Sequence, residues 1–328
     1  MRELCRARLA AAGFNVAEEP FEYSTFPGRW ATPLAGAIAC LTVMSAAMLG
    51  RHGKPGAAIA VVAVAALALI IGGRLIGQRV TTLPVMRASS VNLVATRGIP
   101  RVWLVAHLDS KSQPVAMLAR VAGIVISAGT LIVLAALSGE FVPAHAWHLL
   151  AVIGAVGSLP VIASVVGAKS PGALDNGSGI VTVLLAAEAL PRDMSVGVLL
   201  TSAEELGMAG ARAFAGSRPP AMAINVDGVD DRGTTICMYH GRAARVRVGV
   251  ARAARAIGMR VREQPTIPGL LTDGVALGEA GWSAVTLSRG GLGTLWRIHR
   301  AADTAGRLNG VGMHEVARLL ASAAREIA

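Results

Sequence analysis

Five short segments of this 328-residue chain carry acidic or histidine side chains at positions that could bind a metal ion. They are His107-Leu-Asp109, Asp175-Asn-Gly-Ser-Gly, Glu204-Glu205, Asn225-Val-Asp227 and His299-Arg-Ala-Ala-Asp303-Thr304. Histidine nitrogens and carboxylate oxygens form the donor set typical of zinc and similar divalent ions. Each motif alone is common on protein surfaces, but all five together in one chain predict a metal centre.

Most of these residues directly follow segments that are predicted to be strands. Val102–Ala106 precedes His107, Ser195–Thr201 precedes the two glutamates, and Ala221–Val226 precedes Asp227. The glycine-rich turn that contains Asp175 enters a helix predicted over Gly179–Ala189. Because open α/β sheets build their sites beyond the carboxyl ends of the strands, we expect these side chains to meet at that edge.

The remaining segments alternate between helical and extended patterns with short links. This alternation predicts an α/β fold with a mostly parallel central sheet flanked by helices. Further strands are predicted over Phe21–Phe26, Ser90–Thr96 and Ala284–Ser288. Further helices are predicted over Met1–Phe14, Met208–Ala215, Arg242–Ile257, Asp273–Ala280 and Gly310–Glu326.

Four apolar stretches of roughly 20 residues are each long enough to span a hydrocarbon core of roughly 30 Å. They are Trp30–Leu49, Gly56–Gly73, Ala119–Ser138 and Trp147–Gly167, and their only Asp, Glu, Lys or Arg residue is Arg120. The pattern predicts two transmembrane hairpins, residues 30–73 and 117–168, inserted into one catalytic domain. That domain comprises residues 1–28, 84–116 and 169–328.

The distribution of basic residues predicts how the chain lies in a membrane. Arginines precede the first hairpin and fill the segment between the hairpins, and Lys111, Arg120 and Lys169 flank the second. By the positive-inside rule, a multi-pass protein of the cell membrane with its catalytic domain on the cytoplasmic side is expected. The net charge is +11, but the basic residues are scattered along the sequence, and aromatic residues make up only 4% of the chain. A lipid bilayer is therefore favoured as the partner, and nucleic acid is not.

Two further features of the sequence bear on its cellular compartment. The three cysteines, Cys5, Cys40 and Cys237, are far apart and predict no disulfide framework. Residues 1–14 contain three arginines and no continuous apolar core, so they are not expected to form a signal peptide.

The motifs occur in the order H-x-D, D-N-x-S-G, E-E-x-G-x-x-G, N-x-D and H-x-x-x-D-T. This order resembles the motif order of the co-catalytic di-zinc aminopeptidase family. The members of that family are zinc exopeptidases related to bacterial leucyl aminopeptidases, glutamate carboxypeptidase and glutaminyl cyclase. The resemblance covers residues 1–28 and about 84–328. It implies the following metal ligands: His107 and Asp227 for one zinc ion, Glu205 and His299 for a second, and Asp175 bridging both.

The resemblance also implies that Glu204 is the general base and that Asp109 orients His107. Two positions depart from the family pattern. Ile298 stands where some relatives have an aromatic residue, and Thr272-Asp273-Gly274 replaces a Ser-Asp-His-type motif. The donor that would stabilise an oxyanion is therefore unassigned, with Arg289 and Arg297 as options.

The expected function is that of a membrane-embedded zinc aminopeptidase, which removes the N-terminal residue of a peptide through a metal-activated water. One alternative is a glutaminyl cyclase-like enzyme or another amide hydrolase, with a single zinc on Asp175, Glu205 and His299. A second is a non-catalytic membrane receptor on a peptidase scaffold. Because the second hairpin lies between His107 and Asp175, the active site is expected close to the membrane surface.

Overall fold

The computed structural model describes residues 1–137, 143–241, 243–267 and 269–328. The chain divides into two compact units. The first contains Met1–Ser24, Arg87–Lys111 and Ala168–Ala328, and the second contains Thr25–Met86 and Ser112–Gly167. Each unit is therefore assembled from segments that are distant in the sequence.

The first unit is built on an eight-stranded sheet in the order β1-β2-β4-β3-β5-β8-β6-β7. The four neighbouring strands β4, β3, β5 and β8 are parallel, while β2 and β6 pair antiparallel with the outer two. This confirms the predicted α/β fold. The strands are β1 (Asn15–Ser24), β2 (Arg87–Arg97), β3 (Val102–His107), β4 (Val196–Thr201), β5 (Met222–Val229), β6 (Thr234–Tyr239), β7 (Val261–Pro265) and β8 (Ser283–Gly290).

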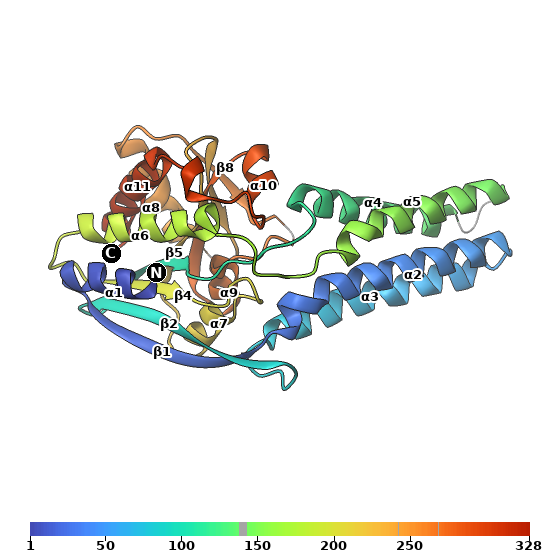
Figure 1. Cartoon of the computed structure of the whole chain (residues 1–328), viewed down its shortest axis with the longest axis horizontal. Coiled ribbons are helices and arrows are strands. Elements are labelled where there is room, and N and C mark those ends of the chain that lie inside the picture. The colour runs from blue at the N-terminus through green and yellow to red at the C-terminus, as the bar shows by residue number, and fades with distance from the viewer. Residues whose placement is uncertain (138–142, 242, 268) are drawn as a thin grey trace. The chain divides into compact units, whose positions relative to one another are not determined.

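Helices cover both faces of this sheet (Figure 1). One face packs against α1 (Arg2–Ala11), α6 (Ser178–Ala189), α8 (Ala244–Ala256) and α11 (Val311–Ile327). The other packs against α7 (Ala209–Gly216) and α9 (Asp273–Glu279). The short helices are η2 (Ala173–Gly177), α10 (Leu292–Arg297) and η3 (Ala305–Arg307).

Strand β3 shows why the centre of the sheet is so apolar. All six of its residues are buried, as expected of a strand covered on both faces. Leu104 belongs to one core cluster, whereas Trp103 belongs to the other and contacts Phe214 edge-on at a ring distance of 4.8 Å. A Cβ at Gly197 on β4 would lie 2.4 Å from the Trp103 ring, so only glycine fits there.

Several predicted boundaries in this unit were wrong. The first strand is Asn15–Ser24 rather than Phe21–Phe26, and β6 and β7 were not expected. Asp227 was expected to follow its strand, but it lies within β5, where the pairing with β8 is irregular between Val226 and Val229. The predicted helix start Arg242 lies outside the described residues, and α8 begins at Ala244.

The second unit consists of η1 (Pro27–Ala31) and the helices α2 (Thr32–Arg51), α3 (Pro55–Gln78), α4 (Met117–Leu137) and α5 (Ala144–Ile162). These four helices, the first counted from Pro27, are long and apolar enough to cross a membrane. They pack through small residues. Gly123 on α4 lies against the Gly157 carbonyl on α5, and the Ser127 and Ser158 hydroxyls are 3.1 Å apart. Large apolar side chains such as Leu41, Val64 and Ile132 are exposed on these helices.

The fourth apolar stretch, predicted as Trp147–Gly167, begins and ends earlier in the structure. Its helix runs from Ala144 to Ile162, and Gly167 instead pairs with Ser112 in an isolated β-bridge. The Ser164 hydroxyl donates to the Pro160 carbonyl and helps to close the last helical turn. Most of the connection between α4 and α5, including Ser138, lies outside the described residues.

Candidate metal centre

Adjacent parallel strands bring the predicted site residues together at the carboxyl ends of the central strands. His107 is the last residue of β3 and is paired with Thr201 at the end of β4. Glu204 and Glu205 follow β4, and Asp227 lies near the end of β5 on the other side of β3. Strand order therefore explains why residues distant in the sequence meet.

Asp175 lies between the two histidines. Its Oδ1 is 3.2 Å from His107 Nε2, and its Oδ2 is 2.8 Å from His299 Nε2. His107 Nε2 is also 3.6 Å from Asp227 Oδ1, and His299 Nε2 is 3.4 Å from Glu205 Oε1. The result is two sets of three possible ligands that share Asp175, each with its ligand atoms within 4.8 Å of one another.

Two side chains fix the loop that presents Asp175. The Asp303 carboxylate accepts hydrogen bonds from the backbone N–H groups of Leu174, at 2.7 Å, and Asp175, at 3.1 Å. Asn176 donates its Nδ2 to the Val226 carbonyl at 2.9 Å, which ties the loop to β5. The loop is therefore held from both sides before any metal binds.

Burial concentrates opposite charges in this site. Burial alone would lower the pKa of His107, but the charge of Glu204 and contacts with Asp175 and Asp227 raise it well above its usual value. Burial would raise the pKa of Asp175, but contacts with His107 and His299 hold it well below the ordinary range. In the metal-free protein these shifts favour a positive charge on His107 beside the carboxylates.

The buried Oε1 of Glu205 has no hydrogen-bond donor in the part of the chain that the structure describes. An unsatisfied buried acceptor costs about 1–3 kcal/mol, so native structures generally provide a partner. A cation between Glu205, Asp175 and His299 would be that partner. Imidazole nitrogens and carboxylate oxygens suit zinc, so the residues present fit the metal.

Glu204 is buried but belongs to neither set of three ligands. Its Oε2 lies 4.0 Å from His107 Nε2. Burial raises the pKa of Glu204 well above its usual value, and the neighbouring Glu205 and Asp227 add to the shift against the opposing charge of His107. A carboxylate that readily holds a proton beside a metal site can act as an acid or a base.

Asp109 contacts different groups from those that were expected. The ring Nδ1 of His107 lies 3.0 Å from the main-chain carbonyl of Asp109 and 3.8 Å from its carboxylate. That carboxylate instead accepts hydrogen bonds from the N–H groups of Glu204 and Glu205, both at 3.1 Å. Its side chain therefore fixes the two glutamates, while its backbone orients the histidine.

The backbone at the site contains two non-glycine residues in the left-handed region. Ala203, just before the glutamates, has φ of 57°, and His299 has φ of 62°. Such residues cost about 1–3 kcal/mol and cluster at functional sites, where the surrounding structure holds them.

Lys111 and Asp273 were not among the residues expected at the metal centre, but the structure places both near it. Lys111 Nζ lies 2.5 Å from Glu205 Oε2, and its side chain is 17% exposed. Asp273 is fully buried and bonded to the Thr201 hydroxyl. Burial raises the pKa of Asp273 to about 7. The sequence H-x-D-S-K could have indicated that Lys111 lies near the metal centre, since Lys111 is two residues beyond Asp109.

Neither arginine considered for stabilising an oxyanion is free of an acidic partner. Arg289 pairs with Glu315 at 2.5 Å, and Arg297 pairs with Asp230. Both cations are therefore already engaged by carboxylates outside the two ligand sets.

The model for "Peptidase family M28" matches residues 92–324. Two solved glutaminyl cyclases are similar over 99% of this chain. The enzyme from Porphyromonas gingivalis is 12% identical, with a TM-score of 0.54, and the match covers 87% of its length. The enzyme from Fimbriiglobus ruber is 14% identical, with a TM-score of 0.53, and the match covers 86% of its length. BSAP, a zinc aminopeptidase from Bacillus subtilis, is 18% identical over 74% of this chain, with a TM-score of 0.47. The chain spans about half of that aminopeptidase, 52% of its length. Curated proteins give no match. Because the family model covers well over half of the chain, this protein belongs to peptidase family M28.

Proposed function

We propose that this protein is a membrane-embedded, zinc-dependent aminopeptidase that hydrolyses the N-terminal residues of peptides. The observation that carries the proposal is the position of Asp175, with one carboxylate oxygen toward each histidine and a second carboxylate beside each histidine. This arrangement suits a pair of metal ions that share one ligand. Membership of the peptidase family supports a hydrolase.

In this proposal the first zinc ion is held by His107 and Asp227, and the second by Glu205 and His299. Asp175 is shared between them. Bound there, zinc would lower the pKa of water and polarise the carbonyl of the scissile bond. Retention of both complete ligand sets favours hydrolysis with two ions over a single-zinc cyclase reaction.

Glu204 would move the proton. It lies beside the ligand sets without belonging to them, so it can take a proton from the attacking water and deliver it to the leaving amine. Asp109 would support this role, because its carboxylate fixes the backbone of Glu204 and Glu205.

The bilayer is the second proposed partner. Helices α2 to α5 would form two transmembrane hairpins, and the arginine-rich segments beside them would lie on the cytoplasmic side together with the catalytic unit. Small residues between the helices and apolar side chains on their outer surfaces support this placement.

The test measures zinc content and turnover of the detergent-purified chain on aminoacyl-anilides and on peptides that begin with glutamine. We expect about two zinc ions per chain, release of the N-terminal residue, and loss of turnover on chelation with recovery on adding zinc. One zinc ion with cyclisation of N-terminal glutamine would replace the proposal with a cyclase. Absence of stoichiometric metal would leave a non-catalytic receptor.

Asp303→Asn tests whether the Asp175 loop must be held in advance. Asparagine can accept only one of the two N–H groups that the carboxylate binds, so zinc affinity is expected to fall about 10- to 100-fold. Competition with a chromogenic chelator measures this affinity. Asp193→Asn, which removes one exposed charge, is the control. Equal affinity in Asp303→Asn and wild type would show that the loop needs no such support.

A further inference from the structure

The first unit contains a pocket that none of the proposed metal ligands line. It has a volume of about 980 Å³, at the upper end of the roughly 300–1,000 Å³ typical of small-molecule sites. Helix α8 forms one wall, and residues of β6, β7, β8 and α11 complete it. The pocket is thus built from several elements of one unit.

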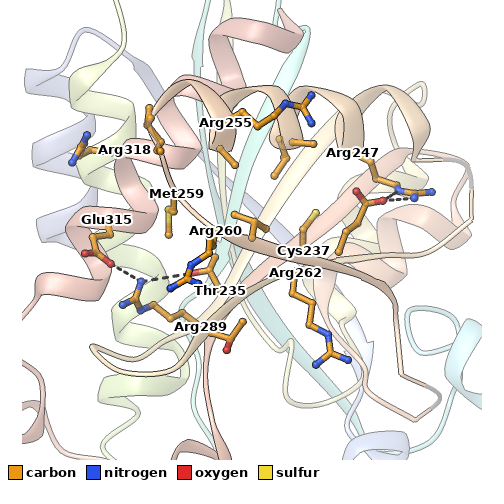
Figure 2. A pocket seen from close by; sticks show the side chains of 18 of the residues that line it. Thr235, Cys237, Arg247, Arg255, Met259, Arg260, Arg262, Arg289, Glu315 and Arg318 are labelled. Atoms are coloured by element: carbon orange, nitrogen blue, oxygen red, sulfur yellow. Dashed lines mark hydrogen bonds and ion pairs between the residues drawn. The ribbon is translucent and has the colours of Figure 1, made fainter.

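Six arginines line this pocket, and Figure 2 shows their side chains distributed around it. They come from α8, the loop before β7, β7 itself, β8 and α11, and they are Arg247, Arg255, Arg260, Arg262, Arg289 and Arg318. The lining contains two carboxylates and no other charged residue, so its net charge is +4.

The two carboxylates engage only two of the arginines. Glu263 pairs with Arg247, and Glu315 pairs with Arg289. The other four arginines have no acidic partner among the described residues. These four arginines are exposed around the pocket (Figure 2), and their combined charge raises the local concentration of anions. The pocket therefore favours an anionic ligand.

The composition of the lining restricts the kind of anion. Guanidinium groups bind phosphate through two parallel hydrogen bonds, and all the cations here are arginines. No aromatic side chain occurs among the described lining residues, so bases have no stacking surface and nucleic acid is disfavoured. Ile257, Met259 and Val261 are only partly buried and provide an apolar area beside the arginines.

We infer that this pocket binds a small phosphate monoester whose apolar part contacts Ile257, Met259 and Val261. Two sources share this chemistry: a free phosphate ester and the headgroup of an anionic phospholipid. The inference does not depend on the proposed peptidase activity, because the pocket and the metal ligands have no residue in common.

Calorimetric titration of the detergent-purified full chain tests the inference. The two probes are glycerol 3-phosphate and dihexanoyl phosphatidic acid, which share a phosphate monoester and differ in their acyl chains. Arg260→Ser and Arg318→Ser change separate segments of the pocket, so a folding defect in one variant does not decide the result. Arg252→Ser is the matched control, since Arg252 is exposed on α8 but does not line the pocket.

Saturable binding is expected for wild type and the Arg252→Ser control, with affinity about tenfold weaker in each pocket variant, because each loses a charge-assisted hydrogen bond. Tighter binding of the short-chain lipid would identify a lipid headgroup as the source. Equal binding of both probes would identify a free phosphate ester. Failure of both probes to saturate wild type, or an equal loss in the control, would overturn the inference.

Discussion

Replacing Glu204 by glutamine is expected to lower kcat by about 10³-fold, within the range typical of removing a general base. Zinc content should not change, because Glu204 belongs to neither set of possible ligands. The fold should tolerate the change, since burial already favours the uncharged form of this side chain. Turnover with the best aminoacyl-anilide, together with metal analysis of the same sample, measures both quantities.

Glu22→Gln provides the matched control for this prediction. It also removes one carboxylate, but Glu22 lies on the edge strand β1, is 73% exposed and pairs with Arg87. Its kcat should equal that of wild type. If Glu204→Gln retained a kcat within about tenfold of wild type, another group would have to carry the proton, and Asp273, with its raised pKa, would be the next residue to replace.

The positions of the proposed metal ligands could be predicted from sequence because each lies in a short motif near the end of an element. His107, Glu205 and Asp227 each lie at or close to the carboxyl end of a strand, and parallel strands place those ends together. The order of the motifs also indicated the family, which the family model confirms.

The supporting contacts could not be predicted, because they join segments that no local pattern relates. Asp303 binds the backbone of residues nearly 130 positions earlier, with separations of 129 and 128 residues. Asp109 reaches the glutamates across 95 and 96 residues. The resemblance implied that Asp109 orients His107, and its carboxylate does lie 3.8 Å from the ring, but its hydrogen bonds to the loop after β4 could not be predicted.

The overlooked strand β7 and the overlooked first part of β1 lie at the two edges of the sheet, where the sequence signal is weak. Strand β7 contains exposed Arg262 and Glu263, and β1 contains Glu18, Glu19 and Pro20. Charged residues and proline are common in edge strands, where they hinder pairing with other chains. The same residues remove the apolar alternation by which a strand is predicted, so β7 and the first part of β1 resemble loops in the sequence.

Replacing Lys111 by methionine is the second prediction with a large expected effect. Burial opposes ionisation of Glu205, yet the charge of Lys111, together with a smaller contribution from His299, lowers the pKa of this carboxyl from 4.5 to about 2. The ion pair therefore stabilises the metal-free fold fully above pH 4.5, and this stabilisation is lost as the pH falls towards 2. Removing the lysine at neutral pH leaves a buried carboxylate without its cation, which is expected to cost about 3 kcal/mol.

At neutral pH the metal-free Lys111→Met variant should melt roughly 6–12 °C below wild type, as followed by tryptophan fluorescence. Saturating zinc should narrow this difference, since a cation at Oε1 of Glu205 replaces part of the lost attraction. Arg8→Met is the control, because it breaks an exposed pair with Glu188 that is worth about 0–1 kcal/mol. A metal-free variant as stable as wild type would contradict the argument. A difference that zinc leaves unchanged would instead place the second metal elsewhere than on Glu205.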